Sequence, residues 1–144
     1  MIELLLQRLE TIFGFLEQIE GITMNQTTVL LQPREGTQEE NEVLEVLESM
    51  VEYKEELTNQ LLDEEAKFEE EYIPYKGKIT EESLVKAFKD RVGKILEKKQ
   101  AIIEVEKNNV IIMQALTRNQ TKATNIPKQP NQVTEAYKKQ QIKT

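Results

Sequence analysis

The sequence contains no cysteine and no histidine, and these two absences exclude several kinds of chemistry. Without cysteine the chain has no disulfide and no thiol nucleophile, and without histidine it has no imidazole base. The usual zinc ligands are missing as well, because protein zinc sites are built mainly from these two residues. A glycine-rich loop that could hold a phosphate is also absent. We therefore expect no enzyme activity, no catalytic residue, no metal site and no cofactor.

Tryptophan is absent too, and glycine, proline and aromatic residues are few. The 144 residues include five glycines and four prolines, 6% are aromatic, and 31% are charged. This composition is typical of long helices with an aliphatic core, and the length is enough for one domain and a tail. The first ten residues lack the basic start of a signal peptide, and their apolar residues are interrupted by charge. We expect a cytoplasmic protein without membrane insertion.

The net charge of −7 is distributed unevenly along the chain. Residues 1–116 carry 13 basic and 25 acidic side chains, whereas residues 117–144 carry six basic side chains and one acidic side chain. An acidic body argues against nucleic acid as the main partner, since binding to phosphates requires positive charge. Binding of nucleic acid through the basic tail is the least favoured alternative.

Apolar residues at alternating steps of three and four predict a first helix over residues 2–31. Leu4 and Phe15 widen its apolar stripe. Residues 21–25, which include a glycine and two β-branched residues, predict a bend, fraying or a break in this helix. Pro33 and Gly36 mark its end. The stripe consists of Ile2, Leu5, Leu9, Ile12, Leu16 and Ile19.

A second helix is predicted over residues 38–73, and its remaining faces are almost entirely acidic. Between residues 38 and 72 the sequence has 14 acidic residues and two lysines. Pro74 and Gly77 predict a turn after it, with a kinked continuous helix as the alternative. The seam of this helix consists of Val43, Leu47, Met50, Lys54, Leu57, Leu61, Glu64 and Phe68.

A third helix is predicted over residues 80–116, and its apolar seam consists of Val85, Phe88, Val92, Ile95, Ile102, Met113 and Leu116. Lys99, Glu106 and Asn109 interrupt this seam. Such polar residues either extend from the edge of the bundle to solvent or specify its register and partner. The basic side chains between residues 86 and 99 and the acidic side chains between residues 63 and 71 would lie side by side if the second and third helices fold back on each other. These two helices are therefore expected to form an antiparallel hairpin. The consecutive acids at 63–65 and 69–71 fan around the helix axis and indicate a solvated face.

Together these patterns predict an all-α fold, an elongated antiparallel three-helix coiled-coil bundle over residues 1–116. Beyond it we expect a polar, disordered C-terminal tail over residues 117–144, because that segment has too little apolar surface to order itself. The alternative for part of the tail is a short helix near 132–140 that folds on a partner.

The apolar residues exceed what such a bundle can bury, especially at 110–113, where the third helix is apolar nearly all round. Exposed apolar surface of this kind indicates self-association, for example a homodimer, or a protein partner. The candidate partner-binding residues are Leu4, Phe15, Ile111, Ile112, Met113, Leu116, Ile126, Val133, Ala136 and Tyr137.

A lysine, spaced leucines, a Leu-Asp pair and an aromatic residue follow one another within residues 52–72. Together with the leucine-rich first helix and the polar C-terminus, this pattern resembles the flagellar export chaperones of the FlgN/FliT type over about residues 2–115. The residues that carry the resemblance are Lys54, Leu57, Leu61, Leu62, Asp63 and Phe68.

The resemblance implies a small, acidic, cytosolic chaperone that binds hook-associated proteins of the hook–filament junction. Such chaperones mask the amphipathic helical termini of their clients, prevent premature assembly and deliver the clients to the type III export gate. The resemblance also implies that the C-terminal region contacts client or gate, which here corresponds to residues 126–142 with Tyr137 as the anchor. The alternative is a structural coiled-coil adaptor that self-associates or binds another helical partner.

Overall fold

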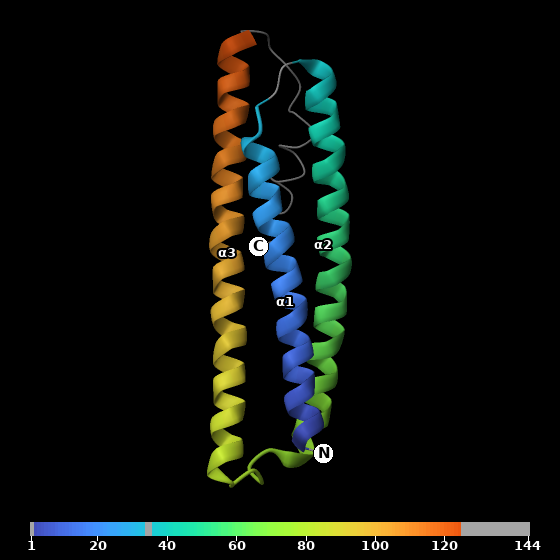
Figure 1. Cartoon of the computed structure of the whole chain (residues 1–144), viewed down its shortest axis with the longest axis vertical. Helices are drawn as coiled ribbons and strands as arrows, with labels where there is room; N and C mark the ends of the chain where they lie inside the picture. Colours follow the sequence, from blue (N-terminus) through green and yellow to red (C-terminus); the bar gives the residue numbers. More distant parts are fainter. Residues whose placement is uncertain (1, 34–35, 125–144) are drawn as a thin grey trace. The chain divides into compact units, whose positions relative to one another are not determined.

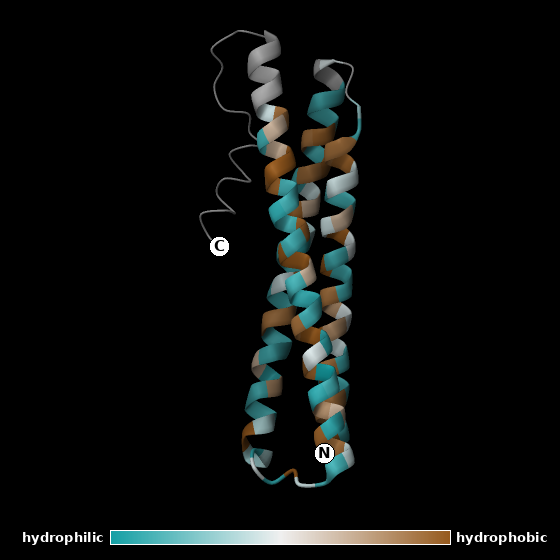
Figure 2. Cartoon of the chain, turned by 90° about the vertical axis from the view of Figure 1, so that its left-hand side faces the viewer, coloured by the Kyte–Doolittle hydropathy of each residue, from teal (hydrophilic) through white to brown (hydrophobic). Residues whose placement is uncertain are grey.

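The computed structural model describes residues 2–33 and 36–124, and every regular element within these residues is a helix. Helix α1 spans Ile2–Leu31, α2 spans Thr37–Tyr72, the short 3₁₀ helix η1 spans Ile73–Tyr75, and α3 spans Glu82–Thr124 (Figure 1). The all-α prediction is confirmed. Hydrophobic residues recur in single turns along each helix rather than in one continuous run (Figure 2). Among the described helices, none is both long enough and apolar enough to cross a bilayer.

The chain divides into two compact units, and each contains one segment of every α-helix. Within the described residues, unit 1 consists of residues 2–21 and 53–102, and unit 2 consists of residues 22–33, 36–52 and 103–124. A helix with a single apolar stripe cannot bury that stripe alone, so three segments supply the enclosing surfaces in each unit.

The core of unit 1 is built from the predicted seams. Apolar side chains at steps of three and four point inward from each helix, so that successive turns supply one buried layer after another. At the end near η1, Tyr72 stacks on Phe68 and also contacts Phe88 of α3. The buried apolar residues of this unit are Leu5, Leu9, Ile12, Leu16, Ile19, Leu57, Leu61, Ile95 and Ile102.

The hairpin of α2 and α3 in unit 1 is antiparallel. Lys99 pairs with Glu65 at 3.0 Å, and Phe88 contacts Tyr72, so α3 rises in number where α2 falls. This matches the predicted hairpin. Lys99, a predicted interruption of the seam, is here one half of an ion pair at the surface.

The prediction that the bases of α3 face the acids of α2 was wrong for two residues. Arg91 pairs with Glu10 of α1 at 2.8 Å, and Lys98 pairs with Glu20 of α1 at 2.9 Å and lies over the ring of Phe13. Matching the charges of only two helices omitted α1, which also packs against α3.

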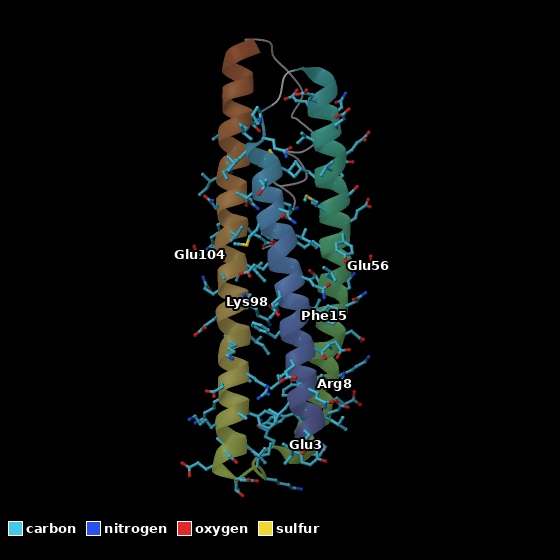
Figure 3. The ribbon with its side chains drawn as sticks, in the orientation of Figure 1. Glu3, Arg8, Phe15, Glu56, Lys98 and Glu104 are labelled. Atoms are coloured by element: carbon cyan, nitrogen blue, oxygen red, sulfur yellow. The ribbon has the colours of Figure 1, made fainter. Side chains whose placement is uncertain are left out.

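Arg8 of α1 connects to α2 in unit 1. Arg8 is labelled on α1 in Figure 3. Its Nη1 donates to Glu64 Oε2 at 2.6 Å, while its Nε and Nη2 donate to the two carboxylate oxygens of Glu71 at 2.5 and 3.2 Å. A two-point bond of this kind fixes the orientation of both groups. The hydrogen bond from Arg8 lowers the pKa of the Glu71 carboxyl below its ordinary value.

Three local features differ from or extend the sequence predictions. Helix α1 continues without a break through residues 21–25, because helical hydrogen bonding tolerates single weak residues when the helix is packed. Helix α2 ends at Tyr72, and Pro74 lies in η1 rather than in a kinked continuation. Gly36 and Gly77 adopt positive φ of 134° and 78° at the two turns, which a residue with a side chain rarely adopts.

Helix α3 continues to Thr124, so the predicted end at residue 116 was wrong. The prediction ended the helix where its apolar pattern ends. Residues 117–124 contain no glycine or proline, and a helix gains one hydrogen bond for each residue added even without an apolar face. The remaining predicted tail, residues 125–144, lies outside the described residues.

Replacement of Arg8 by Met is expected to lower the urea midpoint of unfolding at about pH 7. Because the folded pKa of Glu71 is depressed, this stability is present above the unfolded pKa of about 4.3 and is lost as pH falls through the folded value. The difference between the wild-type and Arg8→Met midpoints should therefore shrink in acid. Urea titrations followed by circular dichroism at several pH values measure this.

The matched control is Arg91→Met, which removes a more exposed ion pair with Glu10. Exposed pairs contribute only about 0–1 kcal/mol, so this control should change the midpoint little. A midpoint difference for Arg8→Met that stays constant down to about pH 3 would contradict the role given to Glu71.

Candidate functional site

In unit 2, α1 and α3 lie side by side and are joined by a buried polar contact. Asn109 Nδ2 donates to the backbone carbonyl of Thr23 at 3.0 Å, and the hydroxyl of Thr27 donates to Asn109 Oδ1. These bonds show which sides of the two helices meet. Residues three, four or seven positions from Thr27 or Asn109 lie on the same side of each helix, and those among them that are not buried flank the line of contact between α1 and α3.

Four apolar residues occupy these flanking positions. On α1, Met24 precedes Thr27 by three residues and Leu31 follows it by four, and both side chains are exposed, Leu31 by 63%. On α3, Ile112 and Leu116 follow Asn109 by three and seven residues, and both are half-buried. We name this surface, made of Met24, Leu31, Ile112 and Leu116, the uncharged face.

The uncharged face takes its name from the two segments of the sequence that contain its four residues. Residues 21–32 of α1 and its end contain no charged side chain, and neither do residues 108–117 of α3, although 31% of the whole chain is charged. An exposed apolar surface without charge is unusual for a region that meets only water. A partner could cover it without removing any charge from water.

Most of the acidic residues of unit 2 lie on α2, and Glu104 and Glu106 of α3 precede the charge-free run at 108–117. Glu42, Glu45, Glu48 and Glu52 of α2 are all exposed, and no lysine or arginine occurs between residues 37 and 52. Exposed carboxylates keep such a surface hydrated and repel other acidic chains. Unit 2 therefore presents an acidic surface on α2 and an apolar surface on α1 and α3.

The apolar core of unit 2 lies beneath this surface and is small. Leu30, Leu47 and Met113, one from each helix, form its centre. The partly buried residues Val29, Val43, Leu44, Met50, Val110 and Ile112 pack against that centre.

The structure brings together only some of the predicted partner-binding residues. Ile112 and Leu116 lie in the uncharged face, whereas Ile111, with 60% of its side chain exposed, is on a different side of α3 because it is about 100° round the helix from Ile112. Met113 is the exception in this group, since it is 4% exposed and belongs to the core of unit 2. The helix turns by about 100° per residue, so four consecutive apolar residues cannot all face a partner.

The other predicted residues are not part of this surface. Leu4 is exposed and Phe15 is half-buried, and both belong to α1 of unit 1. The predictions for the C-terminus fall outside the described residues, namely Ile126, Val133, Ala136 and Tyr137.

Met24 and Leu31 were missed by the sequence analysis. Met24 falls in the segment that was expected to bend or fray, and Leu31 was treated as the helix end. The signal that could have identified them is the charge-free run at 21–32, which has its counterpart at 108–117.

The residues that carry the family resemblance belong to unit 1, and several serve its core. Lys54, Leu57 and Leu61 are buried, and Phe68 stacks on Tyr72. Lys54 does not extend to solvent as a residue at the bundle edge would. Leu57, Leu61 and Phe68 therefore contribute to the helical packing of unit 1.

Among the residues that the structure describes, no three acidic side chains lie close enough to bind a metal ion. Searches of protein-family models, of curated proteins and of solved structures find no match for this chain.

The distinction between core and surface on α3 can be measured directly. Met113→Ala should destabilise the protein by about 2–5 kcal/mol, because it opens a cavity in the core of unit 2. Ile111→Ala should change the free energy of unfolding by less than about 1 kcal/mol, because this side chain already meets water. Urea unfolding of both variants provides the measurement. Similar losses for the two variants would contradict this assignment of core and surface.

Proposed function

We propose that this chain is a cytoplasmic chaperone of flagellar type III export, which binds the amphipathic helical termini of hook-associated proteins. It holds these clients unassembled and delivers them to the export gate. The observation that carries the proposal is the uncharged face of unit 2, an exposed apolar surface that spans two helices. The resemblance over residues 2–115 supplies the class of client.

An amphipathic helix is a suitable occupant of such a surface. Its apolar residues recur at steps of three and four. On α3, Ile112 and Leu116 are four residues apart, and on α1, Met24 and Leu31 are seven apart, which is one step of three and one of four. A client helix laid along these residues buries its own apolar stripe, which would otherwise drive assembly. We also propose that the buried residues at steps of three and four pack as a coiled coil in each unit. A client helix bound at the uncharged face would extend this packing.

The energetics favour a reversible complex. Complete burial of a Leu or Ile side chain is worth about 1.5–3 kcal/mol, so covering the exposed part of Leu31 contributes about 1–2 kcal/mol. The four residues of the uncharged face and a similar set on the client must together exceed a cost of association of about 4–15 kcal/mol. The surplus that remains is small compared with either sum, so we expect a complex of moderate affinity that can release its client at the gate.

The C-terminal residues enter the proposal through the resemblance alone. Ile126, Val133, Ala136 and Tyr137 are assigned to client or gate contacts, with Tyr137 as the anchor. This assignment is independent of the uncharged face.

The test uses the full-length chain and the purified hook-associated subunits encoded in the same genome. Size-exclusion chromatography with light scattering should detect a 1:1 complex with one of them, and calorimetry should give its affinity. Leu31→Glu should weaken binding about tenfold or more, because it places a charge in the apolar contact. The matched control is Leu96→Glu, which changes a similarly exposed leucine of unit 1 and should leave the affinity unchanged.

Binding at an uncharged face should also depend little on salt, since the contact contains no charge to screen. The affinity should therefore change by less than about threefold between about 0.05 M and about 0.5 M NaCl. No complex with any hook-associated subunit would overturn the proposal. A dimer of this chain that Leu31→Glu dissociates would instead support the self-associating adaptor.

A further inference from the structure

The polar contact between α1 and α3 in unit 2 lies inside the seam rather than at its edge. Thr23, Gln26 and Leu30 of α1 and Asn109 and Met113 of α3 are all buried, with Asn109 1% exposed. Asn109 therefore does not extend to solvent, which was one of the two explanations that its position in the seam allowed. Its amide is bonded on both sides to α1.

A buried asparagine can select one alignment of two helices, whereas a purely apolar seam allows several because its pattern repeats. Steps of three and four recur every seven residues, so an apolar helix that slides by seven residues presents nearly the same surface to its neighbour. The sliding distance for one such step is about 10 Å. A polar side chain that finds its partner in only one alignment removes this ambiguity.

The two bonds of Asn109 differ in what they select. Its Nδ2 donates to the backbone carbonyl of Thr23, and every residue of α1 carries such a carbonyl. Its Oδ1 accepts from the hydroxyl of Thr27, and this bond requires a donor side chain at that place. A shift of seven residues would replace Thr27 with Glu20, whose carboxylate cannot donate, or with Arg34, which follows Pro33 beyond the end of α1.

We propose that Thr27 and Asn109 are positioning residues that fix the register of α1 against α3 in unit 2. In this register Met24 and Leu31 of α1 lie beside Ile112 and Leu116 of α3, which assembles the uncharged face from its two halves. The consequence for client binding rests on the proposed function, whereas the register itself does not.

The register can be measured with spin labels, because the chain has no native cysteine. Cysteines introduced by Asn25→Cys and Gln114→Cys occupy exposed positions on α1 and α3 of unit 2. Double electron–electron resonance on the labelled full chain should give one narrow distribution of the distance between the two spin labels. In the Asn109→Leu background a second population should appear, displaced by about 10 Å along the helix axis for a shift of seven residues.

Matched controls separate register from general packing. Asn108→Leu makes the same change at the exposed neighbouring position and should keep the single distance. Thr27→Val removes only the hydroxyl and keeps the shape of the side chain, so it decides the question if circular dichroism shows that Asn109→Leu does not fold. The Thr28→Val variant is its exposed control.

The distance distributions of the variants show whether Thr27 and Asn109 fix the register. A second or broadened distance population in Asn109→Leu or Thr27→Val, but not in the controls, supports it. A single wild-type distance in both folded variants overturns it. If hook-associated subunits bind the wild-type chain, their affinity for the variant should fall in proportion to the fraction in the wild-type register. If no subunit binds, the proposed function fails while the distance measurement still decides the register.

Discussion

Burial of a single apolar stripe on each helix is the constraint on which the rest of this structure depends. A chain with 31% charged residues and few aromatic side chains has no other large source of apolar surface. Because a stripe one or two residues wide must be covered from more than one direction, each unit combines segments of all three helices. The residues at the seam positions then determine what each unit can do. Leu, Ile and Met stabilise packing, whereas a buried Asn109 also selects an alignment.

The two units use charge in different ways. In unit 1, bases and acids on neighbouring helices are joined, as in the bonds from Arg8 to Glu64 and Glu71. In unit 2, α2 is acidic on its exposed side, while the neighbouring parts of α1 and α3 have no charge at all between residues 21 and 32 and between 108 and 117. Since burial of charge is costly, the charge-free surface is the one that a protein partner can cover at least cost. This difference is the physical basis for assigning binding to unit 2.

Much of the fold follows from local pattern, and the exceptions have identifiable causes. The 3-4 spacing predicted the helix that begins at Ile2 and ends at Leu31, and Pro74 with Gly77 predicted the turn after α2. The end of α3 was placed too early because apolar periodicity reports which face is buried, not how far hydrogen bonding continues. The candidate site was predicted in part. Ile112 and Leu116 lie in the uncharged face, but Met113 does not, because consecutive helical residues point in different directions.

By itself, the sequence determined the all-α class, the main helices and the residues that form their seams, since these depend on propensity and spacing along one chain. Only the tertiary structure decided which sides of α1 and α3 meet, because that depends on contacts between residues more than eighty positions apart, such as Thr27 and Asn109. Other long-range contacts, in unit 1, decided that Arg91 and Lys98 pair with α1 instead of α2. In unit 2, the contacts between α1 and α3 have a further consequence. They also joined two separate charge-free runs, one on each helix, into a single surface. A linear pattern gives the face of each helix, and packing alone determines which faces become neighbours.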